Sequence, residues 1–298
     1  MKIGIGTYSF GGMASYLGLG PSLPEKFQTI KSLGFDAVEL LTVDLDEDPE
    51  AIKKWLTETG LEVFSVHAEP TEGIVKKIAA IGGKAVIWAS TPFCNKAEAI
   101  EVALFLDQMA DIAAPYGVKI GYHNHSREFY FVEGKLLIEH LLDNSEKCFV
   151  QLDCGWAMNG GMYPPYFIRK YKNRILSIHV KENSKVIGPG GAPPSRHAKQ
   201  DGMGAVFANA KALPIEEREK ILEEIEGRIK ERAEKGGPSF DVQCRLGAPE
   251  SNIDWKEIKS ALDEQDFDAF WVVEREGFYD EHDKCLAEDR EWLRANIG

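Results

Sequence analysis

The stretch Tyr122-His123-Asn124-His125-Ser126-Arg127-Glu128 ends an apolar run on side chains that bind metal ions. Three further apolar runs of strand length end in the same way: Gln151-Leu152-Asp153, Ser177-Ile178-His179-Val180-Lys181 and Val272-Val273-Glu274. Solubility does not explain why several strands should all stop on Asp, Glu or His. In a parallel barrel the strand ends meet at one face, which carries the catalytic groups. The pattern therefore predicts a single site at the C-terminal end of a barrel.

Strand-like and helix-like segments alternate along almost the whole chain. Strands are expected near residues 2–7, 36–41, 61–67, 84–89, 118–124, 148–153, 175–181 and 269–274. Helices are expected near 24–33, 49–59, 72–82, 96–115, 135–143, 165–173, 255–263 and 280–295. Start and stop signals support them, as where Pro24 leads into a helix and Gly34 follows it. Eight alternations predict an α/β fold, a (β/α)8 TIM barrel formed as one domain over residues 1–298.

One segment departs from this alternation. Residues 183–254 separate the last two expected strands, far more than a loop and a helix need. The segment opens with a Gly/Pro-rich loop, and a charged run over 214–235 follows it, with isoleucine and leucine at helical spacing. Because the insertion leaves from the catalytic face of the barrel, we expect it to form either a lid or a subunit contact. A subunit contact would make the protein a homo-oligomer.

Alternation along a strand decides which side chains face the barrel interior. In the seventh expected strand, Leu176 and Ile178 suit packing against the outer helices, as do Phe64 and Val66 in the third. The inward set then comprises Glu39, Ser65, His67, Gln151, Asp153, Ser177, His179, Lys181, Val272 and Glu274. Burying so many unpaired carboxylates is very costly, so a divalent cation is the simplest compensation.

The fifth expected strand leaves one position of the site open. His123 has the inward parity, whereas Glu128 lies beyond the strand in the following loop. Glu128 could bind a metal only if that loop folds back over the barrel mouth. Either residue could therefore be the fourth ligand.

Bulk composition excludes some partners. A formal charge of −13 and a pI near 5.1 argue against nucleic acid, because phosphate backbones need a basic surface. No window approaches the roughly 20 apolar residues of a membrane span, and the short apolar run at the N-terminus is expected to be a strand, not a signal peptide. The five cysteines are scattered without a CxxC motif, which indicates reduced thiols in a cytoplasmic protein.

Together these motifs resemble the xylose isomerase-like TIM-barrel superfamily of sugar phosphate isomerases and epimerases. The strongest match is the Tyr122–Phe129 motif. It is followed by Gln151–Ala157, by His179–Glu182 and, for the second strand, by Gly34–Leu40. The resemblance covers nearly the full chain and is more specific for the fold and the metal site than for the substrate.

The resemblance implies a metal-dependent enzyme that acts on a small carbohydrate, as an isomerase or epimerase, through an enediolate. One divalent ion, Mn²⁺, Mg²⁺ or Co²⁺, would be held by Glu128, Asp153, His179 and Glu274. Many relatives carry a glutamate where His123 stands, so His123 and Glu128 remain alternatives. Glu128 and Glu274 would be the catalytic pair, one on each face of the reacting carbon. Substrate would be bound by Glu39, His67, His123, His125 and Lys181.

Three other functions fit the same fold. If a hydroxyl left after proton removal, the site would be a dehydratase or lyase for an inosose or a 3-keto-glycoside. A non-catalytic sugar-binding barrel should have a broken metal site. An AP-endonuclease-like barrel would need more metal ligands and a basic DNA-binding face, which the net charge opposes.

Overall fold

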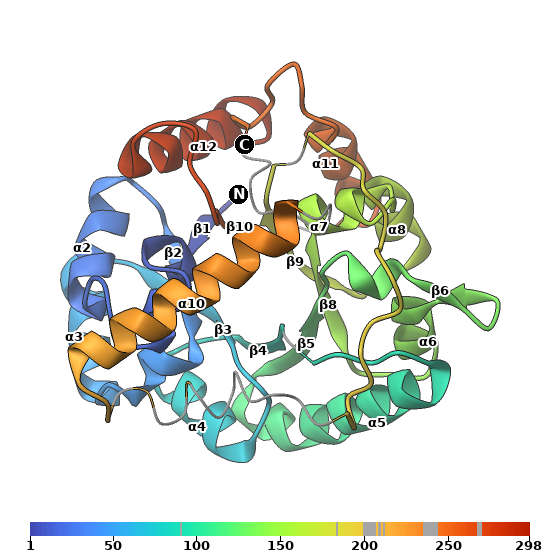
Figure 1. Ribbon diagram of the computed structural model, residues 1–298, viewed down its shortest axis with the longest axis horizontal. Helices are drawn as coiled ribbons and strands as arrows, with labels where there is room; N and C mark the ends of the chain where they lie inside the picture. The colour runs from blue at the N-terminus through green and yellow to red at the C-terminus, as the bar shows by residue number, and fades with distance from the viewer. Residues whose placement is uncertain are drawn as a thin grey trace.

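The barrel predicted from the sequence is confirmed by a computed structural model, which describes residues 1–89, 91–182, 184–198, 207, 210, 212–234, 244–266 and 270–298. Within these residues, eight parallel strands close into a barrel surrounded by helices (Figure 1). The strands are β1 (Ile3–Gly6), β2 (Ala37–Leu41), β3 (Glu62–His67), β4 (Ala85–Trp88), β5 (Lys119–His123), β8 (Phe149–Asp153), β9 (Ile175–Val180) and β10 (Phe270–Val273). Around the barrel they follow the order β1-β10-β9-β8-β5-β4-β3-β2.

Helices lie close to every range expected from the sequence. They are α2 (Leu23–Ser32), α3 (Pro49–Thr59), α4 (Glu72–Ala80), α5 (Lys96–Ala113), α6 (Leu137–Asp143), α8 (Pro164–Lys170), α11 (Trp255–Asp263) and α12 (His282–Asn296). The sequence did not indicate the short helices α1 (Met13–Tyr16) and α7 (Cys154–Asn159), the 3-10 turns Thr7–Phe10, Thr42–Asp46, Ala114–Tyr116 and Arg127–Phe129, or the antiparallel hairpin of β6 (Phe131–Val132) and β7 (Lys135–Leu136).

Local capping explains where the helices begin and end. Helix α3 starts after Asp48, whose carboxylate accepts a hydrogen bond from Ala51 N, and Pro49 occupies the first helical position. It ends at Gly60, whose φ of 66° lies in the left-handed region that favours glycine. Helix α5 starts in the same way after Asn95, which accepts from Glu98 N. These signals fix the strand-to-helix spacing that the barrel needs.

Two residues lie on the opposite face of their strand from the one predicted. Phe64 and Leu176 were expected outside, but they belong to an apolar cluster with Ile87 and Val272 inside the barrel. The Phe64 ring stacks at 4.1 Å on that of Phe270, although β3 and β10 are not neighbours in the barrel. The reason is a register shift: β3 moves by one residue against β2, and β9 against β8. Such a bulge inverts parity and closes the floor of the barrel with large side chains.

Part of the insertion lies over the C-terminal ends of the strands. Helix α10 (Ile215–Glu234) crosses the barrel opening in Figure 1. Arg218 donates to the carbonyls of Leu17 and Gly18, which follow β1. Before α10, Ser195 Oγ and Arg196 N donate to the Glu98 carboxylate at the start of α5. Among the described residues, no helix is both long and apolar enough to cross a membrane.

Candidate active site

A buried glutamate at the end of β2 organises the deepest layer of the site. Glu39 accepts hydrogen bonds from Ser65 Oγ at 2.5 Å and from Gln151 Nε2 at 2.7 Å on one oxygen. Its other oxygen lies 2.7 Å from His179 Nε2 and 3.0 Å from His67 Nε2. Burial would raise the pKa of Glu39, but His67 and His179 hold it well below its usual range. Glu39 is therefore a charged anchor for two imidazoles.

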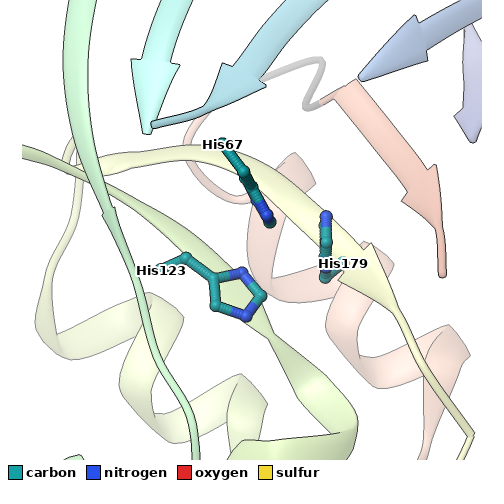
Figure 2. A group of neighbouring side chains, drawn as sticks. All are labelled: His67, His123 and His179. Atoms are coloured by element: carbon teal, nitrogen blue, oxygen red, sulfur yellow. The ribbon is translucent and has the colours of Figure 1, made fainter. Parts of the chain in front are cut away.

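The hydrogen-bond network fixes the tautomers of two histidines. Because the Gln151 amide nitrogen donates to Glu39, the Gln151 oxygen faces His123 Nδ1 at 3.0 Å and His67 Nε2 at 2.7 Å and accepts from both. His123 thus carries its proton on Nδ1 and leaves Nε2 as a lone pair. His179 donates from Nε2 to Glu39, so its Nδ1 either carries a second proton or is free to bind a metal ion. Figure 2 shows the three imidazoles converging from β3, β5 and β9.

His123 Nε2 and His179 Nδ1 both face the same carboxylate oxygen. Asp153 Oδ2 lies 3.6 Å from His179 Nδ1 and 3.9 Å from His123 Nε2, too far for hydrogen bonds. Within the described parts of the chain, neither Asp153 Oδ2 nor His179 Nδ1 has a hydrogen-bond partner, although both are buried. The other oxygen of Asp153 accepts from Trp156 N at the start of α7, which fixes the carboxylate. Buried polar atoms without a hydrogen-bond partner are rare in folded proteins, and a bound ion is one explanation for them.

The geometry fits a metal ion. Two atoms bound to one ion lie roughly 3–4 Å apart, because bonds of about 2.0–2.2 Å meet at tetrahedral or octahedral angles. Glu274 Oε2 lies 3.8 Å from His179 Nδ1, which is also within this range. Ligand atoms of Glu39, His179 and Glu274, and likewise of His67, His123 and His179, lie within 4.8 Å of one another. Oxygen and imidazole donors suit a divalent ion.

A charged lysine connects this cluster to a second carboxyl group. Lys181 Nζ lies 2.9 Å from Glu274 Oε1, 2.8 Å from Glu276 Oε1 and 3.7 Å from Asp153 Oδ2. A Cβ at position 155 would come within 2.6 Å of the Lys181 carbonyl oxygen, so Gly155 allows this close approach. Glu276 was not anticipated from the sequence, because it lies in the loop after β10, where the alternation of side chains along a strand no longer predicts their direction.

The site holds a strongly perturbed set of ionisable groups. Burial lowers the pKa of His179, but the carboxylates of Glu39 and Glu274 outweigh it and raise that pKa to about 10. Burial and the neighbouring imidazoles of His179 and His67 lower the pKa of His123, which keeps its ring neutral. Burial raises the pKa of Glu276 to about 7, with Lys181 opposing and Glu274 reinforcing the shift. A carboxyl group that titrates near neutrality can give or take a proton.

The structure does not bring Glu128 to this cluster. Its Oε1 accepts from Tyr122 OH at 2.8 Å and from Arg127 Nε at 2.9 Å, and its Oε2 accepts from His125 N at 2.7 Å. Tyr122 belongs to the apolar layer between the barrel and the helices, on the opposite face of β5 from His123. Glu128 therefore holds the loop that carries His125, whereas the His123 ring lies within the cluster of imidazoles and carboxylates.

The remaining predicted substrate-binding residues lie around the cluster. The His125 ring lies 5.1 Å from that of His123 and 5.7 Å from that of Trp156, and its buried Nδ1 lacks a hydrogen-bond partner among the described residues. His67, whose side chain is 10% exposed, lies at the edge of the Glu39 network. Asn124, part of the fifth-strand motif, joins β5 to β8 through Asp153 N and Asp153 O.

Comparison with known proteins places the chain in a family. The model of the xylose isomerase-like TIM barrel family matches residues 75–296, so the chain belongs to that family. None of the curated proteins compared with the chain matches its sequence.

Solved structures share the whole fold at low identity. A sugar phosphate isomerase/epimerase from Parabacteroides distasonis is 18% identical, with a TM-score of 0.67, and the match covers 100% of this chain and 95% of that one. The probable 3-DHS dehydratase AsbF from Bacillus anthracis is 13% identical at a TM-score of 0.63, with 100% of both chains covered. IolI with a bound zinc atom is 13% identical with a TM-score of 0.64, and the match covers 100% of this chain and 98% of that one. At such identities the likeness establishes the fold.

Proposed function

We propose that this protein is a metal-dependent isomerase or epimerase of a sugar, keto-sugar or related polyol. The observation that carries the proposal is the pair of imidazole nitrogens, His123 Nε2 and His179 Nδ1, that face Asp153 Oδ2, a buried oxygen without a hydrogen-bond partner among the described residues. When the His179 ring is neutral, these three atoms are all electron-rich, and a cation bound between them removes their repulsion. The zinc in IolI supports a metal in this fold.

The ligands that we propose are His123, Asp153, His179 and Glu274. When bound, a divalent ion would polarise the carbonyl of a hydroxyketone and acidify the neighbouring C–H bond. Two imidazoles and two carboxylates favour a first-row transition ion such as Mn²⁺, Co²⁺ or Zn²⁺ over Mg²⁺. Glu39 and Gln151 hold the two imidazoles in their ligating tautomers.

The chain's own residues supply the proton transfer. Glu274, held by Lys181 at 2.9 Å, is the base that takes the proton from the substrate carbon. Lys181 remains charged, because although burial lowers its pKa, Glu274 and Glu276 raise it well above the usual value. It can therefore stabilise negative charge that develops on a substrate oxygen. His125 and His67 are placed to bind hydroxyl groups.

A second candidate, elimination of water or an alcohol, is supported by Glu276. This carboxyl group shares Lys181 with Glu274 and has a pKa of about 7, so it can protonate a leaving oxygen. The dehydratase among the similar structures is consistent with this reaction. Product mass separates the two candidates, because elimination removes the leaving group whereas isomerisation preserves mass.

Deuterium uptake from D₂O into a panel of ketoses, inososes and 3-keto-glycosides tests the proposal. Wild-type protein loaded with Mn²⁺ should exchange a carbon-bound proton of its substrate, and Glu274→Gln should slow turnover by about 10²–10⁴-fold. The matched variant Glu128→Gln removes a buried carboxylate in the turn after β5, outside the cluster, and should lose far less turnover than Glu274→Gln. Activity that survives exhaustive chelation would refute the metal dependence.

A further inference from the structure

A large cavity opens beside the site, at the end where Glu276 lies. Its volume is about 770 Å³, and its walls come from the loop after β1, from helix α10 and from the loop after β10. The apolar part of the wall comprises Tyr8, Phe10, Met13, Ile229 and Phe278. None of these residues was assigned to the site from the sequence. Pockets of roughly 300–1,000 Å³ suit drug-sized ligands, so this space exceeds what one sugar ring needs.

Aromatic rings form a fixed side of this cavity. The His282 ring lies 5.1 Å from that of Phe10 and 4.5 Å from that of Phe278. His282 Nε2 lies 2.7 Å from Ser9 O and holds α12 to the loop after β1. Because these rings come from three separate segments, the surface is preorganised for a planar apolar group.

The cavity and the cluster meet at two residues. Glu276 lines the cavity and hydrogen-bonds Lys181, which in turn contacts Glu274. Tyr8 also lines the cavity, and the charges of Glu276 and Glu274 act on its hydroxyl group. A ligand that spans this junction would place one part at the imidazole and carboxylate cluster and the other against the aromatic wall.

The charged residues of the wall argue against a phosphate group as the occupant. The Arg275 guanidinium is already held by both oxygens of Asp289 and by Cys244 O. Glu226, Glu276 and Asp283 also line the cavity and outnumber its other basic residue, Lys230, so an anion would meet mostly like charge. A neutral occupant is favoured.

We propose that this cavity binds an apolar, ring-sized substituent of the substrate, so that the substrate is a keto-sugar derivative such as an aryl 3-keto-glycoside and not a free or phosphorylated sugar. The inference rests on the proposed function only for the identity of the sugar part of the substrate, and not for the binding of the apolar part. It also gives α10 a role, because Ile229 contributes one wall of the cavity from the insertion.

The test uses 2-naphthol as a probe of the cavity alone. The full-length protein is titrated with 2-naphthol, and binding is measured by fluorescence. We expect saturable binding that Ile229→Asp weakens by about tenfold or more, because a charge would be placed in an apolar wall. Ile215→Asp lies on the same helix at a position that is 55% exposed and away from the cavity, so it should bind like wild type. Met13→Ala should weaken binding in the same direction as Ile229→Asp.

Two further measurements separate this inference from the proposed function. His179→Ala should abolish the metal site yet leave 2-naphthol binding intact, and an active preparation should prefer 2-naphthyl 3-keto-glycosides to methyl 3-keto-glycosides. Failure of proton exchange with intact naphthol binding would remove the proposed function and keep the cavity. No saturable binding of 2-naphthol, or binding unchanged in both wall variants, would overturn the inference.

Discussion

Nδ1 of His179 and Oδ2 of Asp153 face each other across 3.6 Å, and neither atom has a hydrogen-bond partner in the part of the chain that the structure describes. The Nε2 proton of His179 is fixed on Glu39, so the atom facing Asp153 is a lone pair unless the ring takes a second proton. A proton or a metal ion can fill that place, and four ligand-like atoms favour the metal.

Metal content should depend on His123 and not on Glu128. We expect Asp153→Ala and His123→Ala to lose bound Mn²⁺, because each removes an atom of the converging set. Glu128→Gln should retain it, because that carboxylate is bonded to Tyr122, Arg127 and the His125 backbone. Elemental analysis of purified variants gives metal per chain. Loss of metal in Glu128→Gln with retention in His123→Ala would reverse our assignment.

Glu39→Gln should weaken metal binding without removing a ligand. Glu39 orients His179 through a 2.7 Å contact to Nε2, and loss of such an outer partner lowers metal affinity by about 10–100-fold. Titration with Co²⁺, followed by visible absorption, measures the dissociation constant directly. Ser65→Ala removes only one of the contacts to Glu39 and should have a smaller effect. Unchanged Co²⁺ affinity in Glu39→Gln would show that His179 does not need this partner.

The contact between the insertion and α5 should weaken at acidic pH. Burial would raise the pKa of Glu98, but hydrogen bonds from Ser195, Arg196 N and Cys94 N lower it from 4.5 to about 2. Its stabilisation is therefore complete above about pH 4.5 and is lost as the pH falls toward 2. Glu98→Gln should lower the free energy of unfolding by about 1–3 kcal/mol at pH 7 and by less near pH 3.

Urea unfolding at the two pH values measures this difference. Glu101→Gln is the matched control, since Glu101 is half exposed and its contact with His197 should contribute at most about 1 kcal/mol. An equal loss of stability in Glu98→Gln at both pH values would contradict the assigned charge state.

Removal of the insertion should affect ligand binding more than folding. Replacing residues 186–240 with a short linker deletes α10 and the segment held by Glu98, while the eight barrel strands keep their contacts. We expect a folded barrel by circular dichroism, with reduced turnover, because α10 lies over the strand ends. Unchanged turnover together with an unchanged solution mass would show that the insertion has no part in the site.

The sequence predicted the barrel strands closely because apolar runs bounded by caps are local signals. It placed Asp153, His179, Lys181 and Glu274 correctly on the inner face by alternation alone. It failed at Phe64 and Leu176, because a bulge depends on the neighbouring strand and leaves no mark on alternation. The wall residue Phe10 ends a 3-10 turn and Phe278 lies in a loop, and tertiary contacts set the paths of both segments.

The stacked rings of Phe64 and Phe270 seal the far end of the barrel, which has a consequence for molecular traffic. Ligands must enter and leave by the end that α10 overhangs. A molecule with a polar head and a bulky tail would have to arrive head first and depart tail first. The shape of the barrel would then determine the order in which the two parts of a ligand enter and leave. A bulky fragment that remained bound would block the next substrate molecule and act as a competitive inhibitor.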